Sequence, residues 1–297
     1  MAQRKALRIL TCLFFLSAAP IMAAMSGAAS ARTAASSFSP PKAIPKGKFG
    51  DVIRLGEEVF DHTQTAAKDY VGNGLVCENC HLDRGRLANS APMWAAFVSY
   101  PKYRSKNGKV VTLEDRIRDC FRFSMNGQPP KPDSKQLVAL VSYFYWLGTG
   151  APLGAKLAGA GYPRLPKPRL VADPDRGAAV YQAHCALCHG AHGAGRKAGG
   201  AYVFPPLWGP ESFNWGAGMH QVDTAAGFIK TNMPLGLGGS LANQQAWDVA
   251  AFVDSHPRPQ DPRFTGSVGQ TRQKYHNSSA DYYGQVVHGV LLGASNR

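Results

Sequence analysis

Apolar residues recur near helical spacing in two segments, one late in each half of the chain. Residues 135–147 carry the first set: Leu137, Val141, Phe144 and Tyr145. Residues 241–254 carry the second: Trp247, Val249, Phe252 and Val253, followed by Pro257, which ends the helix. Both segments are therefore predicted to be helices that bury one face in a core.

Each of these helices has an earlier partner. Asp173-Pro174 supplies an N-cap and a first-turn proline for a helix on which Gly177 and Tyr181 are one turn apart. Gly56 and Phe60 repeat this spacing in the first half. Because glycine has no side chain, it lets the partner helix cross closely. This weak repeat predicts an all-α fold of two similar helical domains.

Two pentapeptides of one pattern follow the early helices, one in each half. They are Cys77-Glu78-Asn79-Cys80-His81 and Cys185-Ala186-Leu187-Cys188-His189. In this pattern two thiols attach to the vinyl groups of haem c and the histidine ligates the iron. A bare redox or zinc CxxC pair is the alternative, which two copies make improbable. We expect two covalently bound haem c groups in two cytochrome c-type domains, with these attachment and iron-binding residues: Cys77, Cys80, Cys185 and Cys188; His81 and His189.

Spacing and composition divide the chain into parts. We expect a signal peptide at 1–31, an N-terminal cytochrome c domain at 48–160, a Pro-rich linker at 161–172, a C-terminal cytochrome c domain at 173–260 and a tail at 261–297. The tail has little periodicity and is expected to wrap the surface. Phe60 lies much further before Cys77 than Tyr181 lies before Cys185. The first domain thus carries an insertion between Phe60 and Cys77, which is expected to shape its haem surroundings.

The N-terminus has the features of a secretory signal. Three basic residues precede an apolar run at 9–19, and small residues end at Ala29-Ser30-Ala31. We expect cleavage near Ala31 and a periplasmic product. The apolar run is short for a membrane span and nothing later is long enough, so no stable span is expected; an uncleaved anchor is the alternative.

The charge is strongly positive. The chain has 33 Lys and Arg against 19 Asp and Glu, a net charge of +14, which becomes +11 without Arg4, Lys5 and Arg8 of the leader. Such a charge favours anionic substrates, acidic redox partners or membrane surfaces. Nucleic acid is not an expected partner, because the chain has no recognisable motif for it.

The second haem needs a distal ligand. Met233 precedes Pro234 in the loop before the last helix, where cytochromes c place their methionine. Thioether ligation raises the reduction potential. Met219, which lies nearer to His189 in the sequence, is the competitor, and ordinary core packing is possible for either.

The first haem has a different candidate. Removal of Cys12 with the leader leaves five cysteines, four of them assigned to haem, so Cys120 has no disulfide partner within the chain. Cys120 follows His81 at an interval close to the one that separates Met233 from His189, and a thiolate ligand would lower the potential. The alternatives are a buried inert thiol, or one of these ligands: Met93, Met125 or His62.

Two stretches resemble the bacterial thiosulfate dehydrogenases, dihaem enzymes that join two thiosulfate ions into tetrathionate. The first is Thr112-Leu113-Glu114-Asp115-Arg116-Ile117-Arg118-Asp119-Cys120-Phe121, then Ser124-Met125-Asn126-Gly127. The second is Phe204-Pro205-Pro206-Leu207-Trp208-Gly209-Pro210, then Ser212-Phe213-Asn214 and Gly216-Ala217-Gly218-Met219. The resemblance extends over about residues 50–256.

The resemblance implies a division of roles. The first haem, ligated by His81 and Cys120, would be the active-site haem. The second, ligated by His189 and Met233, would pass electrons outward to a periplasmic acceptor, such as a small c-type cytochrome or a high-potential iron–sulfur protein. Some members have a lysine before the methionine, where this chain has Asn232. The usual arginine before Ser-Met-Asn-Gly is Phe123 here, with Arg122 as a partial substitute.

A reaction between two thiosulfate dianions needs fixed cations. Residues 102–122 contain seven basic residues: Lys102, Arg104, Lys106, Lys109, Arg116, Arg118 and Arg122. Arg116 and Ser124 lie four residues either side of Cys120, one turn away if the segment is helical. Arg104 and Lys106 are further candidates, although single charges are often merely solvated.

Two other function classes stay open at this point. A plain dihaem electron carrier would have methionine or histidine on both distal faces and no use for Cys120. A relative of the cysteine-ligated cytochromes of Sox-type sulfur oxidation would conjugate sulfur to a carrier protein. For thiosulfate oxidation, we expect Cys120 to form a covalent adduct that a second thiosulfate releases as tetrathionate.

Overall fold

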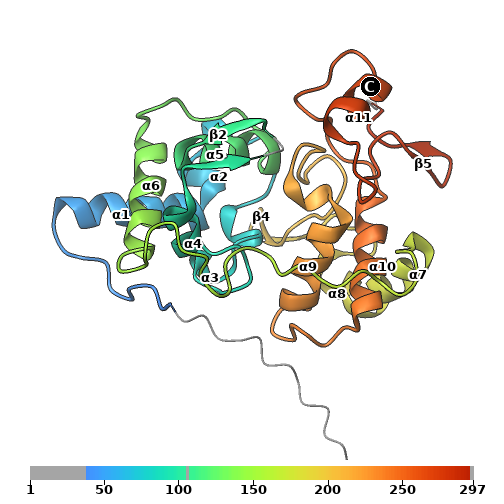
Figure 1. Cartoon of the computed structure of the whole chain (residues 1–297), viewed down its shortest axis with the longest axis horizontal. Helices are drawn as coiled ribbons and strands as arrows, with labels where there is room; N and C mark the ends of the chain where they lie inside the picture. Colours follow the sequence, from blue (N-terminus) through green and yellow to red (C-terminus); the bar gives the residue numbers. More distant parts are fainter. Residues whose placement is uncertain (1–37, 105–106, 295–297) are drawn as a thin grey trace, which may run out of the picture. The chain divides into compact units, whose positions relative to one another are not determined.

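The computed structural model describes residues 38–104 and 107–294. The expected signal peptide, Cys12 and Lys106 lie outside these residues. Within them the chain is mainly helical, with three short two-stranded hairpins, which confirms the expected all-α class (Figure 1). No helix in this part of the chain is both long and apolar enough to cross a membrane.

The first half is organised around two crossing helices. Its helices are α1 (Lys48–Asp61), α2 (Thr63–Ala66), α3 (Leu82–Gly85), α4 (Met93–Ser99), α5 (Leu113–Asp119) and α6 (Lys135–Leu147), with the single turns η1 (Lys68–Tyr70), η2 (Cys77–Asn79) and η3 (Cys120–Ser124). Strands β1 (Lys102–Arg104) and β2 (Lys109–Val111) pair as an antiparallel hairpin. The expected helix at 135–147 is confirmed as α6, whose Ser134 cap accepts from the Leu137 amide.

A glycine sets the distance between α1 and α6. A Cβ added to Gly56 would lie 2.1 Å from the carbonyl oxygen of Ala139, so only glycine permits this crossing. Phe60, one turn later, is fully buried and packs edge-on against Phe144, with ring centroids 5.9 Å apart. The predicted close crossing is therefore confirmed.

The second half repeats this arrangement. Its helices are α7 (Pro174–His184), α8 (Ala186–His189), α9 (Val222–Asn232) and α10 (Asn243–Asp254), with η4 (Gly218–His220) and the hairpin β3 (Arg196–Ala198) and β4 (Ala201–Phe204). Asp173 caps α7 by accepting from the Arg176 amide at 2.9 Å, as expected. A Cβ on Gly177 would lie 2.0 Å from the carbonyl oxygen of Asp248, which fixes the crossing of α7 and α10.

The tail is more ordered than the sequence suggested. It forms α11 (Val268–Tyr275) and a hairpin of β5 (Val286–Val287) and β6 (Val290–Leu291). Tyr283 and Leu292 pack with Trp215 in a small buried cluster. The tail therefore has secondary structure and buried side chains that its weak periodicity did not predict, whereas its wrapping of the surface stays a prediction. Tertiary packing around large side chains replaces the helical periodicity that sequence reading relies on.

The expected linker has no helix or strand, and it contacts both halves. The Tyr162 hydroxyl donates to the carbonyl of Cys80 at 2.9 Å, and its ring lies edge-on to Phe228 of α9. The Trp247 indole of α10 donates to the carbonyl of Pro166 at 3.0 Å. The linker is thus held at several points.

Candidate functional site

The first attachment motif forms the single turn η2 and leads into α3. The amide of His81 donates to the carbonyl of Cys77 at 3.1 Å, which closes the turn. Thr63, in the insertion between Phe60 and Cys77, accepts from the Cys77 amide at 3.2 Å, so the insertion does help to shape this site. Burial raises the pKa of Cys77 and of Cys80 to about 12. Both thiols are therefore protonated and buried in this structure.

Both motif histidines are held for metal ligation. His81 donates from Nδ1 to the carbonyl of Ala91 at 2.8 Å, and His189 donates from Nδ1 to the carbonyl of Pro205 at 2.9 Å. Burial lowers the pKa of His81 to about 4 and also lowers the pKa of His189. Each ring is therefore neutral and keeps Nε2 for another partner, which fits the expected role as an iron ligand.

A cavity of about 390 Å³ adjoins the first motif. Its walls bring together most of the residues singled out in the first half: Cys77, Cys80, His81, Arg104, Arg116, Cys120 and Ser124. The rest of the lining is largely apolar, including Phe60, Leu140 and Phe144. An apolar cavity with two thiols and a neutral imidazole at its wall fits a haem c group.

Cys120 stands where the helix geometry changes. Thr112 caps α5 by accepting from the Asp115 amide at 3.1 Å, and α5 ends one residue before Cys120. Residues Cys120–Ser124 then form a π-turn, in which the Met125 amide donates to the Cys120 carbonyl at 3.0 Å. Such wide turns often occur at functional sites. No sequence pattern indicates this turn, because it differs from an α-helix by one residue of register.

Arg116 lies one α-helical turn before Cys120. The electrostatic interaction with Cys120 raises the pKa of Arg116, more strongly than burial lowers it. Cys120 has no disulfide partner among the described residues. The cavity therefore holds a free thiol group beside a guanidinium that remains charged.

The hairpin β1–β2 adds further cations to the same cavity. Lys102 and Arg104 both belong to β1, and both line the cavity. Arg104 donates to the hydroxyl of Tyr100 at 2.8 Å, and the Lys102 ammonium lies 4.7 Å from the centre of the Tyr100 ring. Burial and the charges of Arg104 and Arg116 lower the pKa of Lys102. Sequence reasoning missed Tyr100, although it lies only two residues before Lys102 and four before Arg104.

The alternative ligands of the first haem occupy different places. Met93 and Met125 line the cavity, as Cys120 does. His62 lies between α1 and α2, where its amide caps α1. Three candidate distal ligands with sulfur therefore line one cavity, and Cys120 is the one with a cation one turn away.

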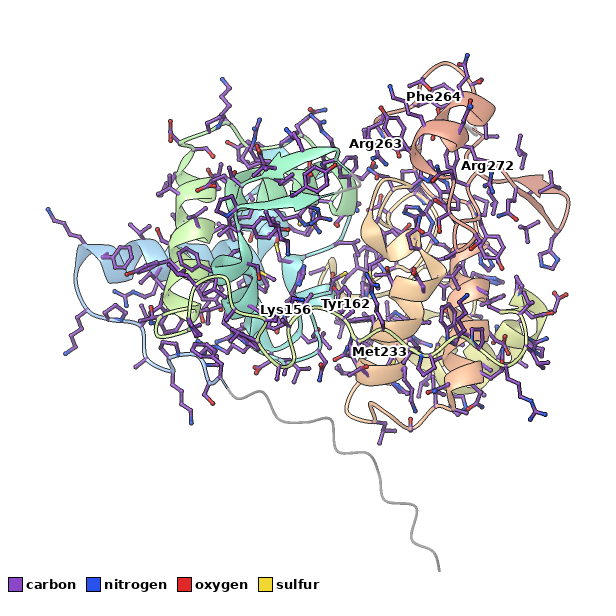
Figure 2. The ribbon with its side chains drawn as sticks, in the orientation of Figure 1. Lys156, Tyr162, Met233, Arg263, Phe264 and Arg272 are labelled. Carbon is purple, nitrogen blue, oxygen red and sulfur yellow. The ribbon has the colours of Figure 1, made fainter. Side chains whose placement is uncertain are left out.

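In the second half, Met233 ends α9 (Figure 2). Met219, the competing ligand, packs against the hydrophobic core of the first half. Its side chain thus has a packing role there, and ligation of the second haem by Met233 stays a prediction. Cys185 packs against Tyr181, Val249 and Val253, an apolar environment that fits the second haem.

A segment of the second half supports the π-turn. Asn214 donates from its side chain to the carbonyl of Arg122 at 2.9 Å, and its amide donates to the carbonyl of Phe123 at 3.1 Å. Asn73 of the first half donates to the carbonyls of Ser124 and Ser212, at 2.8 and 3.0 Å. Sequence reasoning quoted Asn214 within a motif but missed this role, which depends on contacts between distant segments.

Comparisons with known proteins agree with this geometry. Residues 56–153 match the family described as "SoxA/TsdA, cytochrome c domain", and residues 172–253 match "Cytochrome C oxidase, cbb3-type, subunit III". The chain is 55% identical over 260 residues to the thiosulfate dehydrogenase of Stutzerimonas stutzeri (strain A1501), covering 86% of this chain and 85% of the relative. It is 56% identical over 258 residues to that of Thiomonas intermedia (strain K12), covering 86% and 82%.

One solved structure is similar over the same extent. It is the thiosulfate dehydrogenase TsdBA from Marichromatium purpuratum in its "as isolated" form, with a TM-score of 0.84 and 52% identity. The match covers 86% of this chain and 57% of that longer chain. Two cytochrome c domains in an all-α fold are thus confirmed.

Proposed function

The chain belongs to the thiosulfate dehydrogenase family, and on that basis we propose that it oxidises two thiosulfate ions to one tetrathionate ion at Cys120. One observation carries the proposal: Cys120 and Arg116 line the cavity that also adjoins Cys77, Cys80 and His81. A nucleophilic sulfur, a fixed cation and a redox centre would therefore meet in one place.

Two haem groups complete the proposed enzyme. The residues that would hold the first are Cys77, Cys80, His81 and Cys120, and those that would hold the second are Cys185, Cys188, His189 and Met233. When bound, haem supplies one-electron redox chemistry, so a pair of haems matches the electron pair released when one S–S bond forms.

The sulfur chemistry balances in two steps. The Cys120 thiolate bonds to the terminal sulfur of the first thiosulfate, giving Cys–S–S–SO₃⁻ and releasing two electrons. The terminal sulfur of the second thiosulfate then attacks the outer sulfur of that disulfide. The Cys120–sulfur bond breaks, tetrathionate leaves, and the thiolate is restored without net proton transfer.

The cations reduce the repulsion between the reactants. We assign Arg116 to the sulfonate oxygens of the thiosulfate bonded to Cys120, because guanidinium binds such oxygens in pairs. Arg104 is oriented by Tyr100 and, with Lys102, would attract the second dianion. The Ser124 hydroxyl would add a hydrogen bond, and Lys106 is assigned to the same cationic group from the sequence alone.

The compartment and partners follow from the leader and the charge. We propose export to the periplasm with cleavage near Ala31, domains at 48–160 and 173–260, and a linker at 161–172. The net charge of +11 that remains after cleavage suits an acidic redox protein as electron acceptor, such as a small c-type cytochrome or a high-potential iron–sulfur protein.

The test is turnover without any partner protein. The haem-loaded protein is mixed with thiosulfate and an artificial one-electron acceptor, and tetrathionate is measured by chromatography. We expect one tetrathionate for every two acceptor molecules reduced. Absence of tetrathionate from protein with both haems attached would rule out the proposal.

A Sox-type sulfur conjugation is the second candidate, because the matched family description includes SoxA. That reaction would transfer the sulfur to a carrier protein, so it predicts no product when the carrier is absent. A plain electron carrier predicts that thiosulfate reduces neither haem.

A further inference from the structure

Four side chains meet where the tail packs against the second half. His276 Nδ1 lies 2.7 Å from Asp281 Oδ2, and His220 Nε2 lies 2.9 Å from the same oxygen. The side-chain amide of Gln221 lies 2.8 Å from both His220 Nε2 and Asp281 Oδ2. The ligand-type atoms of the two histidines and the aspartate all lie within 4.8 Å of one another.

The outer atoms of this cluster are also fixed. His220 Nδ1 donates to the carbonyl of Ala217, and His276 Nε2 donates to the carboxylate of Asp261 at 2.9 Å. Asp281 accepts the amide of Tyr283 at its other oxygen, Oδ1, at 2.9 Å. Each imidazole thus uses an N–H on its outer side, which directs its second nitrogen toward Asp281 Oδ2. Metal-binding histidines typically show this pattern of outer hydrogen bonds.

We propose that His220, His276 and Asp281 bind a structural Zn²⁺ ion. Imidazole nitrogens and a carboxylate oxygen are ligands that zinc prefers, and a closed site needs a fourth. The Gln221 amide supplies it after rotation, since its oxygen and nitrogen are interchangeable at this position.

The site has the size and setting of a structural ion. Zinc bonds of 2.0–2.1 Å place tetrahedral donors about 3.3 Å apart, so the two ring nitrogens, now 2.7 and 2.9 Å from Asp281 Oδ2, would move away from it by roughly half an ångström on binding. His220, His276 and Asp281 are at most 1% exposed. Tyr283 stacks on the His276 ring at 4.1 Å, and Trp215 lies edge-on to His220. This burial excludes the open position of a catalytic zinc.

An ion at this place would replace protons that the side chains now share. Two ring nitrogens facing one carboxylate oxygen at hydrogen-bond distance each need a positive charge or a proton between them and that oxygen. One divalent ion takes the place of two such protons. The ion would also join η4 of the second half to the tail. Among the described residues, no other group of histidine, cysteine and carboxylate side chains is arranged to hold a metal ion.

The proposal is tested by metal analysis of the haem-loaded enzyme, with iron as the internal standard. We expect one zinc for every two iron atoms, and an X-ray absorption spectrum at the zinc edge with nitrogen and oxygen ligands at about 2.0–2.1 Å. Asp281→Asn and His276→Gln should reduce zinc at least tenfold. His288→Gln, an exposed tail histidine outside the cluster, should keep it.

A metal-free enzyme would overturn the proposal. The protein for this measurement carries both haems and is purified without chelators. The proposal fails if this protein contains less than a tenth of an equivalent of zinc and binds none from micromolar zinc. The four side chains would then form a hydrogen-bonded network only. This measurement uses wild-type protein, so it decides the matter even if the variants fail to fold, and it does not depend on thiosulfate oxidation.

Discussion

Cys120 is the residue on which the proposed chemistry depends. It lies at the first position of a π-turn, a single residue after α5 ends, with Arg116 one turn earlier. A chain that continued as an α-helix would place the residues after Cys120 at a different angle. The local geometry therefore determines which of these side chains line the cavity.

Cys120→Ala should abolish turnover while leaving both haems attached. Cys77, Cys80, Cys185 and Cys188 are unchanged, so attachment continues, but the nucleophile is lost and activity should fall at least about 100-fold. Loss of an anionic ligand should also raise the potential of the first haem. Tetrathionate assays and redox titration measure both effects, and substantial tetrathionate formation by this variant would exclude the covalent mechanism.

Met233→Ala should act on the second haem alone. Thioether ligation favours ferrous iron, so its removal should lower that potential, by roughly 60 mV for each tenfold change in the one-electron equilibrium. A redox titration should show one shifted wave, while Met219→Ala leaves both waves in place. Two unchanged waves in Met233→Ala would exclude the ligand role.

At the scale of elements, two glycines fix two helix pairs. Gly56 brings α1 against α6, and Gly177 brings α7 against α10. Both could be predicted from the sequence, because a glycine one helical turn before a buried aromatic residue is a local pattern. The bounds of α6 could be predicted from the helical spacing of its apolar residues. Helix α10 begins at Asn243, slightly later than the same kind of pattern predicted.

Gly177→Ala should destabilise the protein. Its Cβ would meet backbone atoms of Asp248, which cannot move separately from α10, and overpacking of this kind costs about 2 kcal/mol. Gly269→Ala is the matched control, because this helical glycine of α11 has no atom within 4 Å of the new Cβ. That change should stabilise by about 0.5–1 kcal/mol. The two variants should therefore change the free energy of unfolding, measured with denaturant, in opposite directions. Equal changes would contradict the packing argument.

The last residue of α1 should make stability depend on pH. Burial, with the charges of Glu78 and Glu57, raises the pKa of Asp61 from 3.8 to about 6, against the opposing charge of Arg84. Between these values the folded protein binds a proton that the unfolded chain has lost. The free energy of unfolding should therefore fall as pH rises from about 4 to about 6.

Asp61→Asn should remove this part of the pH dependence. Denaturant unfolding of the haem-loaded protein at several pH values measures it. Asp51→Asn, on an exposed turn of the same helix, is the control and should keep the wild-type slope. The same slope in Asp61→Asn would show that another group is responsible.

At the scale of the whole molecule, long-range contacts determine what the sequence could not show. The haem motifs, the helix pairs and the position of Cys120 follow from local patterns of a few residues. The contacts of Asn73 and Asn214 with the π-turn, and the cluster around Asp281, join segments far apart in the sequence. No local pattern encodes such contacts, which is why the secondary structure of the tail was not predicted.

Tyr162 is the linker residue that should matter most for the cooperation of the two halves. Its ring lies between His81 and Phe228, with centroids 6.4 and 5.4 Å away. Tyr162→Leu should separate one unfolding transition into two, because ring contacts with both halves are lost. Tyr162→Phe should cost only about 1 kcal/mol, since the carbonyl of Cys80 also accepts from Ser90. A single, unshifted transition in Tyr162→Leu would contradict this role.

The hydrogen bonds from Asn214 to the π-turn limit how freely the second domain can be exchanged for another cytochrome domain. They place part of the support for the turn that begins at Cys120 in the half proposed to carry electrons away. Exchanging that half for an unrelated cytochrome would leave the carbonyls of Arg122 and Phe123 without these donors. A chimera intended to redirect the electrons must therefore retain the 212–214 segment, so the boundary for such engineering lies inside the second domain and not at the linker.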